Sequence, residues 1–309
     1  MKPLVSVIIN SCNSSIYVES AIDSVLRQSY QNWEIIFLDN QSTDGSCEIV
    51  KKYGDPRIRI YTTPGRIALG AARNQALGYV NGHWIAFLDT DDLWHSDKLN
   101  KQIDYVLCNP QLDFIYTNYA NIYSEDDVKI AKPQLTDNQP NGDVFGQFLE
   151  HYPVNLQTVL IRAECLLKMP ELFPSNYEVA EEYDLFLRYV YNRKVGYLNE
   201  ILVYYRLHPA QQSRKLILCY ALEIADTIKK LKVLHPESVV KYSIEYARIE
   251  CKLIYYHARA MSQKGEKSGA RKMLQTVMLK DWRLFLMTIL LCLPGNLFGY
   301  VHKKLGRYY

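Results

Sequence analysis

Three aspartates crowd into four positions directly after an apolar run, in the segment WIAFLDTDDLW at residues 84–94. Asp89, Asp91 and Asp92 repel one another unless a positive charge lies among them. Mg²⁺ and Mn²⁺ are hard cations that take one or two carboxylates together with the oxygens of a substrate phosphate. The alternative is that the aspartates cap a helix beginning near Ser96, but one cap needs only one residue. The cluster therefore favours a site for Mg²⁺ or Mn²⁺.

The elements that must position this cluster read as strands alternating with helices. Apolar runs of strand length between residues 4 and 118 are LVSVII, WEIIFLD, RIRIYT, WIAFLD and DFIYTN, and segments of helical spacing separate them. This alternation predicts an α/β fold whose mostly parallel central sheet is covered on both faces. Ligands bind outside the carboxyl ends of such strands. Asp39 and Asp89 each end a run, so we expect both at one rim.

The pattern changes after residue 118. Residues 125–143 are polar, with Pro and Gly, and predict an exposed or mobile excursion. A short strand QTVLI, a helix from Ala180 to Tyr191 and the segment VGYLNEILVYYRLH follow. Beyond about Ser213 the apolar residues step by three and four on both sides of the turn QKGEK. That spacing predicts a helical hairpin.

The C-terminal tail is apolar and basic. Its run LFLMTILLCL has ten residues, and Pro294-Gly295 separates it from LFGYV. A bilayer crossing needs about 20 apolar residues, so the tail is too short to span one. Residues 282–309 hold four Lys or Arg and no acidic residue, which suits docking on an anionic membrane surface. The alternative is that these runs pack on the hairpin as ordinary core.

Composition limits the partners and the compartment. The net charge of +3 is small and the basic residues are dispersed along the chain, so we expect no nucleic-acid partner. Seven cysteines without a C-x-x-C pair favour a reducing compartment over a disulfide framework. The N-terminal MKPLVSVIIN reads as a first strand and not as a signal peptide. We therefore expect a cytoplasmic protein, peripheral on the cytoplasmic face of the membrane.

Six motifs in order resemble one enzyme family. They are VSVIINSCN, SVLRQSYQNWEIIFLDNQSTDGS, GAARNQAL, FLDTDDLW, EEYDLFLR and YRLHPAQQS. Together they are similar to the inverting glycosyltransferases of family 2, which have the nucleotide-sugar-binding GT-A fold. The resemblance covers roughly residues 3–213. It implies a GT-A domain over 1–213. The spacing and composition described above add a helical hairpin region over 214–280 and an amphipathic, membrane-associating tail over 281–309.

The resemblance also implies roles for individual residues. Asp91, Asp92 and His208 would hold the metal ion. Asp39 would accept hydrogen bonds from the base or ribose, Arg73 would approach the nucleotide and Asp91 would reach the ribose. Residues implied to bind substrate are Asn10, Asp39, Asn40, Arg73, Asp89, Asp91, Glu181 and Arg206. The donor would be a nucleotide-diphospho-sugar, with a UDP-sugar expected first. The acceptor would be a hydroxyl, including that of a lipid-linked glycan.

Glu182 takes the position of the general base, which is usually Asp in the family. A carboxylate there would remove the proton of the acceptor hydroxyl as the sugar carbon is attacked. Without the motif, Glu181, Glu182 and Asp184 are typical of a solvated first helical turn. If Asp184 were the base, the alignment would be shifted. Asn10, Cys12 and Asn40 replace the family's usual Pro, Tyr and Asp, so base stacking would fall to Tyr30 or Tyr61.

The resemblance implies sugar transfer in bacterial surface polysaccharide or glycolipid synthesis. Two other functions are alternatives to this prediction. A strand followed by Asp-x-Asp also introduces Mg²⁺-dependent aspartyl phosphatases, although Leu93 stands where they favour Thr or Val. The departures at Asn10, Cys12, Asn40 and Glu182 also fit a catalytically degenerate scaffold. A dinucleotide-binding dehydrogenase is set aside because no G-x-G-x-x-G follows the first strand.

Overall fold

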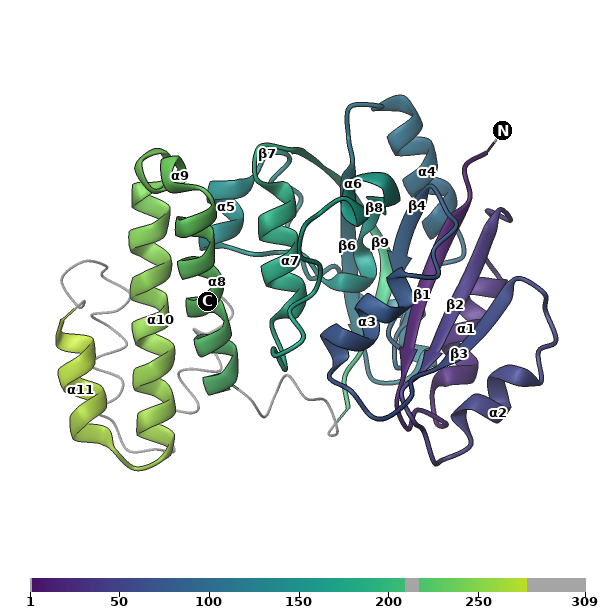
Figure 1. The fold of residues 1–309 in the computed structure, drawn as a ribbon, viewed down its shortest axis with the longest axis horizontal. Helices are drawn as coiled ribbons and strands as arrows, with labels where there is room; N and C mark the ends of the chain where they lie inside the picture. The colour runs from purple at the N-terminus through teal and green to yellow at the C-terminus, as the bar shows by residue number, and fades with distance from the viewer. Residues whose placement is uncertain (1, 209–216, 277–309) are drawn as a thin grey trace. The chain divides into compact units, whose positions relative to one another are not determined.

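The computed structural model describes residues 2–208 and 217–276, which form two compact units. One unit comprises Met1–Phe148 and Pro153–Gln211, and the other comprises Leu149–Tyr152 and Gln212–Tyr309. The expected boundary at residue 213 and the tail at 281–309 lie outside the described residues. Each unit is considered by itself below (Figure 1).

A mixed nine-stranded sheet forms the centre of the first unit. Its strands are β1 (Val5–Ser11), β2 (Trp33–Asp39), β3 (Ile58–Thr62), β4 (Trp84–Phe87), β5 (Leu93–Trp94), β6 (Phe114–Ile122), β7 (Gly142–Asp143), β8 (Leu160–Arg162) and β9 (Lys194–Arg206). The order is β3-β2-β1-β4-β8-β6-β9-β5, with β7 paired to β9. The first four of these are parallel, as expected, while β8 runs antiparallel to both its neighbours.

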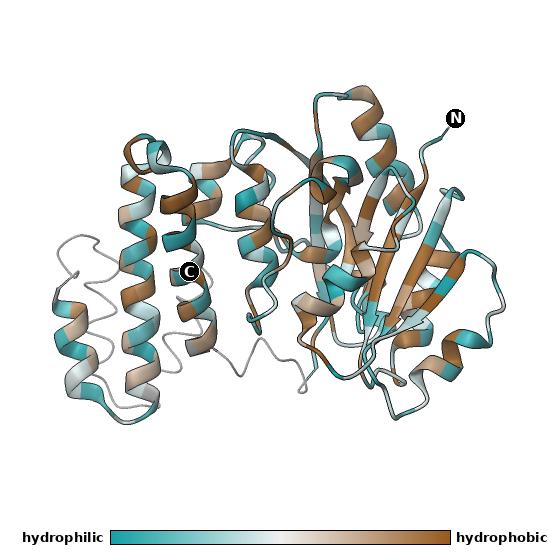
Figure 2. Cartoon of the chain, viewed as in Figure 1, coloured by the Kyte–Doolittle hydropathy of each residue, from teal (hydrophilic) through white to brown (hydrophobic). Residues whose placement is uncertain are grey.

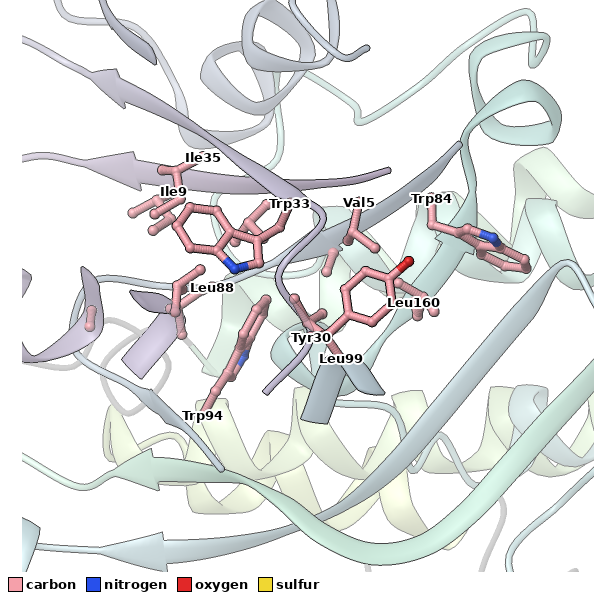
Figure 3. Packing of buried hydrophobic residues seen from close by; sticks show 14 of the residues in the cluster. Val5, Ile9, Tyr30, Trp33, Ile35, Trp84, Leu88, Trp94, Leu99 and Leu160 are labelled. Atoms are coloured by element: carbon pink, nitrogen blue, oxygen red, sulfur yellow. The ribbon is translucent and has the colours of Figure 1, made fainter. Parts of the chain in front are cut away.

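Helices cover both faces of the sheet, as the alternating pattern predicts. The helices are α1 (Val18–Leu26), α2 (Ser46–Lys51), α3 (Leu69–Leu77), α4 (Lys98–Cys108), α5 (Phe145–Glu150), α6 (Ala163–Leu167) and α7 (Glu181–Val190), with 3₁₀ turns η1 (Glu125–Ile130) and η2 (Leu156–Thr158). Alternate residues of β1, including Val5 and Ile9, join Val25 of α1 and Leu99 of α4 in one buried cluster (Figure 3). On the opposite face Phe87 packs edge to face against Phe173.

The strands are hydrophobic along most of their length (Figure 2), so polar groups concentrate where the strands end. Asp39 is the last residue of β2, and Asp89 follows β4 by two positions. Since β2 and β4 both pair in parallel with β1, their carboxyl ends lie at one rim. The expected placement of both aspartates is confirmed.

The excursion at residues 125–143 is exposed but anchored. Asn118 of β6 donates its Nδ2–H to the carbonyl of Leu135 at 2.9 Å and accepts the Leu135 N–H at 3.0 Å. Ala120 also forms an isolated antiparallel bridge with Pro133. The reciprocal amide contacts hold the segment along β6, which a reading by composition alone misses.

The second unit contains the expected helical hairpin. It is made by α10 (Ser243–Gln263) and α11 (Lys267–Gln275), and α8 (Ile217–Leu234) and α9 (Pro236–Lys241) precede it. Tyr255 and Ala258 of α10 pack with Ala270 and Leu274 of α11. No helix within the described residues has both the length and the apolar character that a bilayer crossing needs.

We expect Gly70→Ala to destabilise the protein. A Cβ at Gly70, near the start of α3, would lie 2.4 Å from the backbone oxygen of Pro174, which cannot yield as a side chain would. Such overpacking costs about 1–3 kcal/mol. Gly65→Ala is the matched control, because a Cβ there meets nothing within 4 Å. Urea unfolding measures both variants, and equal stabilities would contradict the close approach.

Candidate active site

The strand β5 ties the acidic turn to the end of β9. Leu93 pairs with Tyr204 in an antiparallel ladder. The ladder is extended by the backbone N–H of Arg206, which donates to Oδ1 of Asp92 at 2.8 Å. Arg206 also donates its Nε–H to the carbonyl oxygen of Asp91 at 2.9 Å. Residues more than a hundred positions apart are thereby joined, and the Arg206 guanidinium is brought among the carboxylates.

His208 completes this side of the site. Its Nε2 lies 2.9 Å from Oδ2 of Asp91, within hydrogen-bonding distance. The ring of Tyr17, from the β1–α1 loop, lies between the two basic side chains, 5.4 Å from the His208 ring and 4.8 Å from the Arg206 guanidinium carbon. Tyr17 could not be predicted from the sequence, because an aromatic residue at the start of a helix carries no chemical signal by itself.

Asp92 is the carboxylate best suited to a cation. It is 1% exposed, and its Oδ2 is buried with no hydrogen-bond partner among the described residues. Burial raises the pKa of Asp92 well above its ordinary value, and the charges of Asp91 and Asp89 add to the rise. A buried oxygen without a donor fits a metal ligand, because an unmade hydrogen bond there is costly.

The three aspartates do not cap the helix that follows. That helix, α4, begins at Lys98, its N-cap is Asp97, and no side chain caps it. The capping alternative is therefore wrong. No group of three or more His, Cys, Asp or Glu side chains among the described residues forms a ready metal cage. Protein carboxylates that bind Mg²⁺ commonly rely on substrate phosphates and water for the remaining ligands.

Asp89 is held by the protein through both oxygens. Arg73 of α3 donates to Oδ1 at 3.1 Å, and Gln157 of η2 donates its Nε2–H to Oδ2. Burial raises the pKa of Asp89, while the charge of Arg73 opposes that rise. Gln157 was missed because a single Gln in a 3₁₀ turn has no sequence signature. Its donor orients the carboxylate that opens the acidic turn.

Arg73 links the acidic turn to the start of α7. Arg73 is 3% exposed, and its guanidinium pairs with Glu181 as well as with Asp89. Oε2 of Glu181 is buried, and nothing in residues 2–208 or 217–276 hydrogen-bonds to it. A buried ion pair of this kind contributes more to geometry than to stability. Arg73 thus fixes the helix that carries Glu182 against the strand that carries Asp89, and its approach to a nucleotide stays a prediction.

Glu182 lies beside this pair and is half-buried. Burial, followed by the neighbouring charge of Glu181, raises the pKa of Glu182 to about 8. Because the folded-state pKa lies above the unfolded value, folding favours the proton, and stability falls as pH rises between those two values. A carboxylate poised near neutral pH suits general-base chemistry.

Asp184 has a different environment, which supports the alignment on Glu182. Its carboxylate is fully buried and accepts the Nε–H of Arg188 at 2.8 Å. Arg188 also donates to the carbonyls of Glu171 and Leu172, each at 2.6 Å. Asp184 therefore anchors the loop before α7, and it is not placed to accept a proton from a substrate.

Hydrogen bonds join the end of β2 to the surrounding loops. Asp39 accepts the Ser42 N–H at 3.2 Å. Asn40 donates to the Ile67 carbonyl at 2.8 Å and accepts the Ile67 N–H at 3.0 Å. An aspartate could not donate the first of these bonds, which gives a structural reason for Asn at this position. The amide holds the β3–α3 loop over the rim, and binding of substrate by Asn40 stays a prediction.

The aromatic rings expected to replace the missing stacking residue are already engaged. Tyr30 is 1% exposed within the core, so it cannot stack on a base. Tyr61 stacks on Tyr79, with ring centroids 3.7 Å apart and the planes within 1°. Asn10 near the end of β1 has a buried Nδ2 that no other described residue pairs with.

The comparisons with known proteins agree with this geometry. The profile of the family described as "Glycosyl transferase family 2" matches residues 6–161, half of the 309 residues. The chain belongs to glycosyltransferase family 2. This membership decides against the aspartyl phosphatase.

Bacterial relatives of this glycosyltransferase act in surface glycan synthesis. It is 33% identical over 197 residues to WfgD of Escherichia coli, a UDP-Glc:alpha-D-GlcNAc-diphosphoundecaprenol beta-1,3-glucosyltransferase, covering 63% of this chain and 73% of WfgD. It is also 33% identical over 211 residues to TuaG of Bacillus subtilis, provisionally named a teichuronic acid biosynthesis glycosyltransferase, covering 67% and 80% of the two chains.

Solved structures confirm the GT-A fold. TarS of S. aureus in complex with UDP-GlcNAc superposes with a TM-score of 0.60 at 18% identity, over 93% of this chain and 86% of the TarS chain. The mannosyltransferase PcManGT of Pyrobaculum calidifontis, in complex with GDP-Man and Mn²⁺, gives 0.63 at 15% identity, over 97% and 83%. At these identities the likeness establishes the fold alone.

We expect Asp184→Asn to lower stability and leave the turnover of the folded enzyme unchanged. The neutral amide would leave the buried Arg188 charge uncompensated, at a cost of about 3–5 kcal/mol. Glu164→Gln is the matched control, since the Glu164–Lys168 pair has the same helical spacing but is largely exposed. Its loss should leave stability nearly unchanged, because water screens an exposed pair. Thermal unfolding and specific activity separate the two effects, and an inactive, stable Asp184→Asn enzyme would move the base to Asp184.

Proposed function

We propose that this family 2 glycosyltransferase moves a hexose from a UDP-sugar to a hydroxyl of a lipid-linked glycan, with inversion at the anomeric carbon. The proposal rests on one observation, which is that the site contains two acidic groups of different character, the Asp91–Asp92 turn and Glu182. The Asp91–Asp92 turn suits a cation and a diphosphate. Glu181, the residue before Glu182, is joined to that turn through Arg73 and Asp89.

Asp91, Asp92 and His208 are the residues that would hold Mg²⁺ or Mn²⁺. The buried, unpartnered Oδ2 of Asp92 and the exposed fraction of Asp91, 30%, support that assignment. The solved structure of PcManGT with Mn²⁺ supports a divalent cation in the same fold. A bound cation neutralises charge that develops on a departing diphosphate.

Glu182 would act as the general base of a single displacement. Its carboxylate takes the proton of the acceptor hydroxyl while that oxygen bonds to the anomeric carbon. The bond from the anomeric carbon to the diphosphate oxygen breaks, and its electron pair leaves with the diphosphate. Because the two oxygens lie on opposite sides of the carbon, the configuration inverts.

The rim around Asp39 would take the nucleoside. Asp39 accepts hydrogen bonds, Asn10 has an unused donor, and the amide of Asn40 fixes the loop beside them. Complexes of TarS with UDP and with UDP-GlcNAc, and the UDP-Glc donor in the name of WfgD, favour uridine. Arg206 and Glu181 would contact the diphosphate and the acceptor side respectively.

A lipid-linked acceptor would place the enzyme at the cytoplasmic face of a membrane. The name of WfgD includes a diphosphoundecaprenol acceptor, and that of WfaP of Escherichia coli does so as well. The division into a GT-A domain over 1–213, a helical region over 214–280 and a membrane-associating tail over 281–309 fits this location. The tail would supply basic and apolar contacts to the lipid surface.

We expect Asp92→Asn to abolish stabilisation by UDP with Mn²⁺. Asn keeps an oxygen for the Arg206 N–H but has no charge for a cation. In the wild type a ligand at 100 times its dissociation constant adds about 2.7 kcal/mol to the free energy of unfolding. Asp126→Asn removes the same charge from an exposed position and is the control. Full stabilisation of the wild type by UDP in EDTA would contradict a metal role.

We expect Glu182→Gln to lower turnover by about 10²–10⁴ without changing stabilisation by UDP, because only the general base is lost. In the wild type the acid limb of the kcat/KM profile should lie well above the ordinary pKa of a glutamate, since the pKa of Glu182 is raised to about 8. Glu48→Gln, on an exposed position of α2, is the control. Full turnover by Glu182→Gln would remove Glu182 from the mechanism.

A further inference from the structure

Exposed aliphatic side chains gather where α8, α9 and α10 meet. Residues 229–245, called the α9 corner here, contain four of them. They are Val233 (72% exposed), Leu234 (51%), Val240 (82%) and Ile244 (63%). Among the described residues the other exposed large hydrophobic side chains are dispersed along the chain. An exposed apolar cluster of this kind marks an interaction surface.

The α9 corner is held by its own polar contacts. Ser238 of α9 is fully buried, donates to the His235 carbonyl at 2.6 Å and lies 2.9 Å from the hydroxyl of Tyr246. The Tyr242 N–H donates to the Ser238 carbonyl at 2.8 Å. Figure 1 shows α9 closing one end of the α8–α10 pair. These hydrogen bonds hold α9 in place, so the exposed aliphatic side chains are not needed to close the turn.

Positive charge accompanies the aliphatic side chains. The α9 corner contains four lysines, Lys229, Lys230, Lys232 and Lys241, and two glutamates, Glu237 and Glu245. Lys232 pairs with Glu250, which lies outside the corner. Lys229 and Lys241 are exposed and flank the aliphatic cluster in the sequence. Aliphatic side chains flanked by lysines are suited to bind a partner whose surface is negatively charged and whose interior is apolar.

We propose that the α9 corner docks on an anionic lipid surface, with Val240 and Ile244 entering the apolar layer. The lysines beside the aliphatic side chains favour anionic lipid headgroups as the partner. The choice of lipid over protein also rests on the proposed function, in which the acceptor is lipid-linked. The α9 corner includes none of residues 281–309, which lie outside the described residues.

The test is hydrogen exchange on the full chain, without nucleotide, in the presence of vesicles. Vesicles of phosphatidylcholine mixed with phosphatidylglycerol should slow exchange of amides in residues 229–245, and vesicles of phosphatidylcholine alone should do so much less. The double variant Val240→Glu/Ile244→Glu should bind the mixed vesicles about tenfold more weakly or worse in co-sedimentation, because two carboxylates replace inserted side chains. Both positions are exposed, so the variant folds.

The control is Ile130→Glu, which changes an equally exposed aliphatic residue in the first unit and should leave vesicle binding unchanged. Unaltered exchange at residues 229–245 with mixed vesicles would overturn the proposal, and so would unreduced binding by the double variant. Protection that appears without vesicles as protein concentration rises would show a second copy on this surface instead, and would also overturn it. Since no step requires turnover, failure of sugar transfer with intact vesicle binding would refute only the proposed function.

Discussion

The organisation of the first unit depends on keeping several carboxylates at one rim of the sheet without mutual repulsion. The protein gives each one a separate partner. Asp89 takes Arg73 and Gln157, Asp91 faces His208, and Asp92 accepts a backbone N–H. In a low-dielectric rim these contacts are strong, and an unpaired charge there is correspondingly costly. The partners come from α3, η2 and β9, so the carboxylates determine which distant segments must meet.

The pairing register of β9 is the main feature that brings these distant segments to the carboxylates. Pairing with β5 carries Arg206 to Asp92, and parallel pairing with β6 fixes the other edge of the same strand. A slip of one residue would turn the Arg206 side chain to the opposite face, because side chains alternate along a strand. The buried Arg73 performs the corresponding task between β4 and α7. Two long-range contacts therefore align the acidic turn with the helix that carries Glu182.

Local pattern predicted the parallel part of the sheet and the hairpin, and long-range contacts account for what it missed. Runs such as WEIIFLD and WIAFLD are apolar enough to be strands in any context. The two residues of β5 are too few to have a period, yet β5 positions Arg206. Gln157 matters only because Asp89 lies beside it. Family resemblance pointed to the acidic residues, but their partners follow from the tertiary structure.

The structure separates two kinds of acidic residue that look alike in the sequence. Asp184 and Asp89 have their oxygens engaged by arginine or amide donors, and such carboxylates hold loops and helices in place. Within the described part of the chain Asp92 retains a buried oxygen without a donor, and burial raises the pKa of both Asp92 and Glu182, so both are destabilised as anions in the folded protein. Folded proteins retain such unfavourable groups where chemistry requires them. Under the proposed function, Asp92 and Glu182 would act on the substrate, and Asp184 and Asp89 would support them.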